Sequence, residues 1–335
     1  AGLTTSAHVK WQPAPDLPGR WRHRPGSRLW SNSVFTAIAA VRRPDVVFCP
    51  WLVVPKARVA PTVVTLHDVC FRTHPDSFAD GGRRGDEVLA AAVESASEIV
   101  TPSAESKRGV VAAYGVDERR VTVVRHGIES VFNPVTDSRD TDRLRKLGIE
   151  SPYFLCVSTH EPRKNLGVLA RAFTCFVEQS GQHEGIPQLV LIGRPSPETA
   201  RIVETLATSP LASRQTRFVD GLSDVELVSA YRRALAVVLP TVCEGFGFPL
   251  LEAIASGTPA IASDLAVFRE LVDDAALFVP SGEVGAWVAA LDRASVDTDL
   301  RHRALQAASR VRCQFSWRAS AAETLRVLER AAGGG

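Results

Sequence analysis

Methionine is absent from the 335 residues, and aromatic residues make up only 7% of them. No apolar run reaches the ~18 residues that a membrane-spanning helix needs, and the N-terminus lacks the charged-then-apolar layout of a signal peptide. We therefore expect a cytoplasmic protein.

The six cysteines are scattered singly, mostly inside apolar runs. No C-x-x-C pair and no Cys/His ligand spacing occurs, so the sequence suggests neither a zinc site nor a disulfide framework. We interpret the cysteines as buried thiols that behave as small hydrophobic residues.

Charge is nearly balanced at +2, but residues 1–60 carry nine Lys and Arg against two acids. The basic run at residues 20–24 would suit an anionic lipid surface, as on the inner membrane face, or a phosphorylated acceptor. A solvated loop is the simpler alternative. Because no aromatic-interleaved basic stripe continues beyond this stretch, we expect no nucleic-acid partner.

Short β-branched runs alternate with amphipathic helical stretches, which predicts an α/β protein with parallel sheets. Asn165 and Ser223 are predicted helix N-caps, and Gly257 is a predicted helix end. The strand candidates are 45–49, 61–66, 97–101, 121–125, 153–159, 188–193, 216–219, 236–240, 259–263 and 276–279.

The chain is longer than one hydrophobic core usually serves, so two domains are expected. The polar, Pro/Asp-rich stretch at 129–150 marks the boundary. We predict an acceptor-side domain at 1–140 and a nucleotide-sugar-binding domain at 150–315. The last helix, at 316–331, should return to pack on the first domain.

A doubly wound nucleotide-binding domain normally opens with a strand and a Gly-rich turn. Residues 1–30 contain neither. We therefore expect the first domain to lack its first strand and Gly-rich loop in this numbering, and the missing methionine fits a chain that does not begin at its native start.

The most informative segment is 240–252, PTVCEGFGFPLLE. A strand end, a Gly-rich turn and a Pro suited to a first helical turn follow one another, which places free backbone N–H groups at the sheet edge where α/β folds bind phosphates. Glu244 lies on this turn and Glu252 on the helix, where a carboxylate suits a sugar diol. A capped helix start is the structural alternative.

Two adjacent cations, Arg163 and Lys164, open the second domain in the loop STHEPRKN at 158–165. The planar guanidinium of Arg163, with its several N–H donors, and the compact ammonium of Lys164 would suit a diphosphate. The alternative is that the two side chains are only solvated, as paired surface cations often are. His67 and Asp68 follow a first-domain strand, at an edge that faces the crevice between the domains. A structural loop histidine is the alternative there.

Glu244 and Glu252, separated by seven residues, resemble the EX7E motif of retaining GT-B glycosyltransferases of family 4, of the mannosyltransferase-like group. The stretch AIASGTP at 253–259 and the loop at 161–165 are also similar to that family. The resemblance extends from about residue 45 to the last helix. It implies a GT-B fold, with two Rossmann-like domains whose parallel sheets face each other across a cleft.

The resemblance also implies residue roles. Glu244 and His67 would act at the transferred sugar, Glu252 at the ribose, and Arg163 with Lys164 at the diphosphate. Asp68 would lie on the acceptor side. The backbone of residues 245–248 would hold sugar and distal phosphate, and further main-chain groups would bind the base. The residues that would hold the sugar and the distal phosphate are Gly245, Phe246, Gly247 and Phe248. The residues that would bind the base are Gly193, Val219, Asp220 and Gly221.

Two positions depart from the family's pattern. Ser158 stands six residues before Lys164, where some members have an additional arginine, so more of the leaving-group charge falls on Arg163 and Lys164. His126 stands where the family usually has an asparagine, next to Gly127. This change puts an acceptor contact at His126 in doubt.

The family implies transfer with retention of configuration and no metal, with a GDP- or UDP-sugar as co-substrate and no other cofactor. The donor would give up a hexose to a saccharide, lipid-linked or small-molecule acceptor. No DxD-like acidic pair lies beside the phosphate loop, and cations with backbone amides would suit the leaving diphosphate. A sugar-nucleotide epimerase and a non-catalytic nucleotide-sugar-binding protein stay as alternatives. No GxGxxG follows a strand, which disfavours a dehydrogenase.

Overall fold

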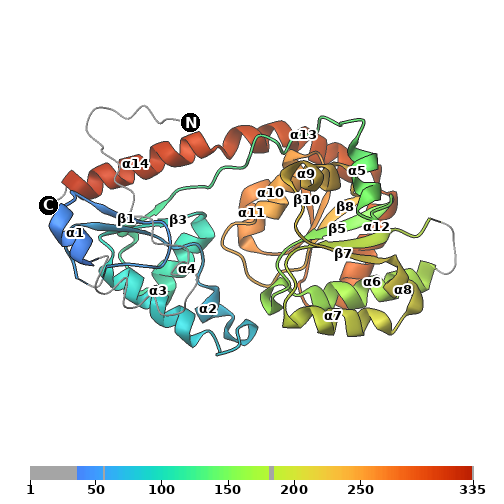
Figure 1. Cartoon of the computed structure of the whole chain (residues 1–335), viewed down its shortest axis with the longest axis horizontal. Helices are drawn as coiled ribbons and strands as arrows, with labels where there is room; N and C mark the ends of the chain where they lie inside the picture. The colour runs from blue at the N-terminus through green and yellow to red at the C-terminus, as the bar shows by residue number, and fades with distance from the viewer. Residues whose placement is uncertain (1–35, 56, 181–184, 334–335) are drawn as a thin grey trace.

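The computed structural model describes residues 36–55, 57–180 and 185–333, which form two α/β domains, each built on a parallel sheet (Figure 1). The predicted α/β class is confirmed. The basic run at 20–24 lies outside the described residues. So do residues 1–30, to which the expected lack of a first strand and Gly-rich loop refers.

The first sheet has four parallel strands in sequence order, and their register aligns Val63 of β2 with Phe48 of β1 and with Glu98 of β3. The strands are β1 Val47–Cys49, β2 Thr62–Thr65, β3 Glu98–Thr101 and β4 Val121–Val123. Helices and 3-10 turns connect them: α1 Thr36–Arg42, α2 Cys70–Thr73, η3 Pro75–Ser77, α3 Arg83–Ser95, α4 Ala104–Tyr114 and η4 Glu118–Arg120.

The second sheet has six parallel strands in the order β10-β9-β8-β5-β6-β7, so the order reverses between β5 and β8. In open α/β sheets, ligands bind outside the carboxyl ends of the strands at such a reversal. The strands are β5 Tyr153–Val157, β6 Gln188–Ile192, β7 Thr216–Val219, β8 Ala236–Leu239, β9 Ala260–Ser263 and β10 Ala276–Val279. Each of the ten predicted runs contains a strand.

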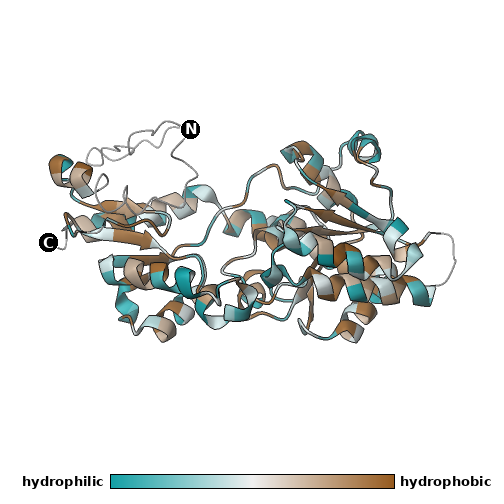
Figure 2. Ribbon diagram, turned by 60° about the horizontal axis from the view of Figure 1, so that its bottom comes forward, coloured by the Kyte–Doolittle hydropathy of each residue, from teal (hydrophilic) through white to brown (hydrophobic). Residues whose placement is uncertain are grey.

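Helices cover both faces of the second sheet, and its interior strands β6, β8 and β9 are buried along their whole length. Parallel strands covered on both faces are apolar throughout, as Figure 2 shows for the centre of each domain. The helices are α5 Asp140–Lys146, η5 Pro162–Lys164, α6 Leu166–Ser180, α7 Pro197–Ala207, α8 Pro210–Gln215, α9 Asp224–Arg233, α10 Phe248–Ala255, α11 Ala266–Val272, α12 Val284–Val296 and α13 Thr298–Gln314.

The last helix, α14 Trp317–Gly333, leaves the second domain and lies along the first (Figure 1). Its Val327 and Leu328 are buried against Val63 of β2 and Val100 of β3. This apolar contact ties the end of the chain to the first sheet, so two chain segments connect the domains, one at 124–139 and one at 314–317.

Two of the three predicted helix ends are confirmed. Ser223 forms a capping box with Glu226 at the start of α9. Gly257 has φ +72° after α10, and the N–H groups of Gly257 and Thr258 bond to Ile254 and Ala253, both at 2.9 Å, in a Schellman motif.

The prediction that Asn165 caps a helix with its side-chain oxygen is wrong. Asn165 adopts a left-handed conformation with φ +54°, and its side-chain amide donates to the carbonyl oxygens of Pro240, at 3.1 Å, and Ser281, at 2.8 Å. The residue joins three loops at the carboxyl edge of the sheet. The sequence pattern cannot show this, because the partners are far away along the chain.

The interpretation of all six cysteines as free thiols is also wrong. A disulfide joins Cys70, at the start of α2, to Cys243 in the loop after β8, with Cα atoms 6.0 Å apart. The two residues are separated by 173 positions, so spacing alone cannot reveal the pair. The bond crosses from the first domain to the second, next to Glu244. The other four cysteines are free: Cys49, Cys156, Cys175 and Cys313.

We therefore predict that protein purified without reductant and denatured has four alkylatable thiols, and that reduction exposes six. Peptide mapping by mass spectrometry should find Cys70 linked to Cys243. As a control, Cys70→Ser should make the remaining five cysteines reactive without reduction. Six reactive thiols in the unreduced wild type, or a link between other cysteines, would contradict the assignment.

Candidate active site

Three charged side chains gather at the carboxyl edge of the second sheet. Lys164 Nζ forms an ion pair with Glu244 Oε1, and an Arg163 guanidinium nitrogen lies 3.5 Å from Glu244 Oε2. Arg163 also pairs with Glu161 at 3.0 Å. Lys164 and Glu244 follow β5 and β8, which are neighbours in the sheet, so strand order alone brings these loops together. The predicted proximity of Arg163, Lys164 and Glu244 is what the structure shows.

Backbone hydrogen bonds fix the two loops to each other. The Val242 N–H and the Thr241 hydroxyl both donate to the carbonyl oxygen of Arg163, at 2.9 and 3.0 Å. The amide of Asn165 donates to Pro240 in the same loop. Lys164 and Glu244 are therefore held on a rigid support, with side chains only 13% and 14% exposed.

The Gly-rich turn of the second domain lies directly on the first domain. A Cβ atom on Gly245 would collide with the carbonyl oxygen of His67, so only glycine fits there. Ser103 Oγ donates to the Gly245 carbonyl at 2.8 Å, and Ser106 Oγ donates to the His67 carbonyl at 2.9 Å. Ser103 also caps α4, because its side chain accepts the N–H of Ser106. The contact of Ser103 with Gly245 cannot be predicted from the sequence, because the two residues are far apart along the chain.

Glu270 of α11 makes a second contact between the domains. Its two carboxylate oxygens accept the N–H groups of Ala104, at 3.0 Å, and Glu105, at 3.2 Å, in the first turn of α4. Arg125 lies 3.5 Å from the same carboxylate. A carboxylate at a helix N-terminus is stabilised by the unpaired N–H groups there. Glu270 therefore helps to fix the position of one domain on the other.

His67 lies at this junction, between the ends of β1 and β4. Its Nε2 is 3.3 Å from the carbonyl oxygen of Pro50, and its Nδ1 is 3.3 Å from Nε2 of His126. The indole of Trp51, 64% exposed, packs beside its ring at 5.5 Å. The neighbouring Asp68 uses one carboxylate oxygen to accept the N–H of Cys70 at 2.9 Å.

The turn at Phe246, Gly247 and Phe248 begins α10. Among the described residues, the backbone N–H groups of these three residues have no hydrogen-bond acceptor. Gly247 has φ +117°, and a Cβ there would lie 2.6 Å from the ring of Phe268. The glycine thus allows the loop to close over the start of the helix, where free N–H groups favour an anion.

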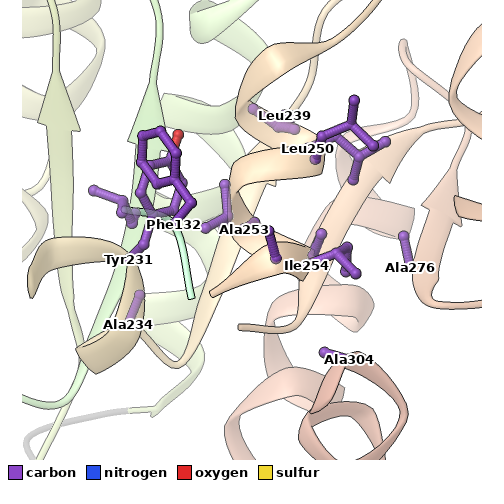
Figure 3. Close-up of a cluster of buried hydrophobic side chains, with 14 of the residues drawn as sticks. Phe132, Tyr231, Ala234, Leu239, Leu250, Ala253, Ile254, Ala276 and Ala304 are labelled. Atoms are coloured by element: carbon purple, nitrogen blue, oxygen red, sulfur yellow. The ribbon is translucent and has the colours of Figure 1, made fainter. Parts of the chain in front are cut away.

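Glu252 lies in the second turn of α10. The hydroxyl of Tyr231 donates to its carboxylate at 2.7 Å. Burial raises the pKa of Glu252, while this hydrogen bond acts to lower it. Tyr231 is fully buried beside Phe132 (Figure 3). Its role was missed, because a tyrosine on an apolar helix face is typical of the core.

The predicted base-binding residues lie at the ends of β6 and β7. The Gly193 N–H donates to the carbonyl of Val219 at 3.0 Å, and a Cβ on Gly193 would collide with the Ser158 carbonyl oxygen. Gly221 has φ +72°, and its N–H bonds to Asp220 at 2.8 Å. Along the sheet edge these loops come next to the loop of Lys164, because β5, β6 and β7 are successive strands.

A small pocket lies between the loops that carry Lys164 and Glu244. It is lined by Ser158, Lys164, Glu244, Gly247 and Pro249. A larger, shallow hollow near Asn133 and Arg312 contains none of them, so chemistry favours the smaller pocket. Across the described ranges, no three His, Cys, Asp or Glu side chains gather as metal ligands, and no helix is long and apolar enough to cross a membrane.

Comparison with known proteins gives the family. Residues 140–311 match the family described as glycosyl transferases group 1, and residues 4–131 match glycosyltransferase family 4. The chain is 28% identical to the O-antigen chain mannosyltransferase RfbU of Salmonella typhimurium, over 68% of this chain and 59% of the relative. It is 30% identical to a D-inositol 3-phosphate glycosyltransferase of a Nocardioides species, over 81% of this chain and 62% of the relative.

The chain thus spans about three-fifths of the length of these two relatives. Among solved structures, Anabaena HepE in complex with UDP and glucose is similar in fold, with a TM-score of 0.72 over 90% of this chain and 83% of that one, at 17% identity. The first match alone covers half of the sequence. The chain therefore belongs to the glycosyl transferases group 1 family and has its two-domain GT-B fold.

Proposed function

We propose that the protein transfers a hexose-type sugar from a GDP- or UDP-sugar to a saccharide, lipid-linked or small-molecule acceptor, with retention of configuration and without a metal. The observation that carries the proposal is the cluster of Lys164, Arg163 and Glu244 beside the free N–H groups that begin α10. Two cations and a helix N-terminus suit a diphosphate leaving group.

The electrostatics of the cluster support a role in catalysis. A diphosphate gains negative charge as the bond to the sugar breaks, and preorganised donors in a partly dry site stabilise that charge without rearranging. Glu244 holds Lys164 and Arg163 in place through ion pairs that are largely shielded from water. Its carboxylate would also accept a hydrogen bond from a hydroxyl of the transferred sugar.

Front-side transfer fits these residues best. The acceptor oxygen bonds to the anomeric carbon on the face from which the diphosphate departs, and its proton passes to a phosphate oxygen. Lys164, Arg163 and the N–H groups of Gly247 and Phe248 would bind the departing phosphates. His67 would contact a sugar hydroxyl from the first domain, and Asp68 would lie on the acceptor side.

What is known of similar proteins from their names supports a nucleotide-sugar donor. One is an O-antigen chain mannosyltransferase, and HepE was solved with UDP and glucose. The base would lie against the main chain at Gly193, Val219, Asp220 and Gly221, and the ribose against Glu252. Main-chain contacts of this kind accept more than one base, so both GDP- and UDP-sugars are donors to test.

Incubation with each donor, with and without acceptor, should give a glycosylated product whose anomeric configuration, measured by NMR, matches that of the donor. Lys164→Ala should lower kcat/KM by roughly 100-fold, about 3 kcal/mol, because a charge-assisted contact to the diphosphate is lost. Lys146→Ala, the same change at an exposed position on α5, should leave the rate unaltered.

Other outcomes would contradict the proposal. An inverted product would exclude front-side transfer, and an isomerised donor without acceptor would indicate an epimerase. Binding without turnover, seen as a rise in melting temperature, would indicate a nucleotide-sugar-binding protein. A normal rate in Lys164→Ala would remove that residue from the mechanism.

A second prediction concerns the ribose site. Tyr231→Phe removes the hydrogen bond that lowers the pKa of Glu252, so this pKa, already raised by burial, rises further. Because the ribose diol needs the ionised carboxylate, binding is lost as pH falls through that pKa. In Tyr231→Phe the rise in donor KM on acidification should therefore begin at a higher pH, with KM about 5-fold higher at neutral pH and kcat unchanged.

Tyr153→Phe is the matched control for this experiment. Tyr153 is equally buried, and its hydroxyl donates to the Ala230 carbonyl at 2.7 Å without touching Glu252. This variant should lose stability but keep the wild-type pH profile of donor KM. The same acid shift in both variants would mean that packing, and not the hydrogen bond to Glu252, sets the profile.

A further inference from the structure

The hydrogen bonds around His67 determine which of its ring nitrogens carries the proton. Nε2 lies 3.3 Å from the carbonyl oxygen of Pro50, and a carbonyl oxygen only accepts. Nε2 of His67 therefore carries the proton, and its Nδ1 has a free lone pair. Nε2 of His126, at 3.3 Å, must then be the donor to that lone pair. Only this placement of the two ring protons satisfies both contacts of His67.

His126 is held by aromatic rings from the other side of the junction. Its ring stacks on Phe248 at 5.5 Å with an angle of 10°, meets the edge of Phe246 at 5.1 Å, and lies 5.8 Å from Trp317. Burial is the largest cause that lowers the pKa of His126, to about 4. At neutral pH the ring is therefore uncharged, with one N–H to donate.

The backbone beside His126 is fixed as well. A Cβ on Gly127 would collide with the backbone nitrogen of Trp317, so the chain passes α14 with no room for a side chain. The Ile128 N–H donates to the Phe315 carbonyl at 3.1 Å. His126 is therefore positioned by the Gly-rich turn of the second domain and by the start of α14.

We propose that His126 is a positioning residue that holds the ring of His67 in the Nε2–H tautomer, with this N–H directed to the reacting sugar. The proposal rests on the sugar-binding role proposed for His67. With Nδ1 occupied by His126, His67 presents a donor at Nε2, which a sugar hydroxyl takes in exchange for the Pro50 carbonyl. The aromatic contacts make this orientation depend on the docked Gly-rich turn.

Two substitutions separate the hydrogen bond from the packing. His126→Phe keeps an aromatic ring among Phe246, Phe248 and Trp317 but has no N–H. His126→Gln has a side-chain amide nitrogen as many bonds from Cα as Nε2, so it restores a donor without the aromatic ring. A role in packing alone predicts that phenylalanine is the better replacement, whereas our proposal predicts glutamine.

The direct readout is the tautomer of His67, observed by long-range ¹H–¹⁵N NMR of protein labelled at histidine. The spectra are recorded near pH 8, above the ordinary histidine pKa of ~6.5. His67→Asn identifies its signals. Wild type and His126→Gln should show His67 protonated at Nε2, and His126→Phe should show a mixture of tautomers. Activity should follow, with kcat lowered ~5- to 10-fold in His126→Phe and largely restored in His126→Gln.

Three results would overturn the proposal: a wild-type His67 protonated mainly at Nδ1, a His67 tautomer unchanged in His126→Phe, or a His126→Gln variant as impaired as His126→Phe. The wild-type spectrum needs no variant, so a misfolded substitution does not prevent the test. If no variant or wild type transfers sugar, the proposed function fails, while the tautomer result still decides the hydrogen bond between the two histidines.

Discussion

The absence of a side chain at Gly245 allows the Gly-rich turn of the second domain to lie on the backbone of His67 in the first. The other contacts of the junction lie around this one: the Ser103 hydroxyl, the Cys70–Cys243 disulfide and the Glu270 carboxylate. All of them join the two domains. The loops at the carboxyl edges of the two sheets are therefore held against each other.

The division of labour between the domains follows from the sheet topology. In the second domain, β5 and β8 are adjacent at the point where strand order reverses, so their loops bring Lys164 and Glu244 together. The first domain contributes His67 from the end of β2, at the corresponding edge of its own sheet. In the proposed mechanism, the charged groups that bind the donor thus come from one domain, while the histidine and the exposed Trp51 come from the other.

Much of this arrangement is encoded locally. Runs of β-branched residues predicted the strands, and because parallel strands end at one edge, the proximity of Arg163, Lys164 and Glu244 followed. The features that escaped prediction join residues far apart in sequence. The Cys70–Cys243 bond, the Tyr231–Glu252 hydrogen bond and the amide contacts of Asn165 depend on tertiary packing, and each residue alone has a commoner structural explanation.

The most direct test of this account is the substitution Gly245→Ala, with sugar transfer and donor affinity measured side by side. A Cβ there forces the turn away from His67, so transfer should fall by roughly 100-fold, as expected for a small misplacement of a reacting group. Donor affinity, measured by calorimetry, should fall much less than transfer, because the proposed donor contacts of Arg163, Lys164 and Glu252 lie outside the displaced turn. Gly282→Ala, with open space around its Cβ, should behave as wild type. Wild-type transfer by Gly245→Ala, or an equal loss of donor affinity, would contradict the central role of the junction.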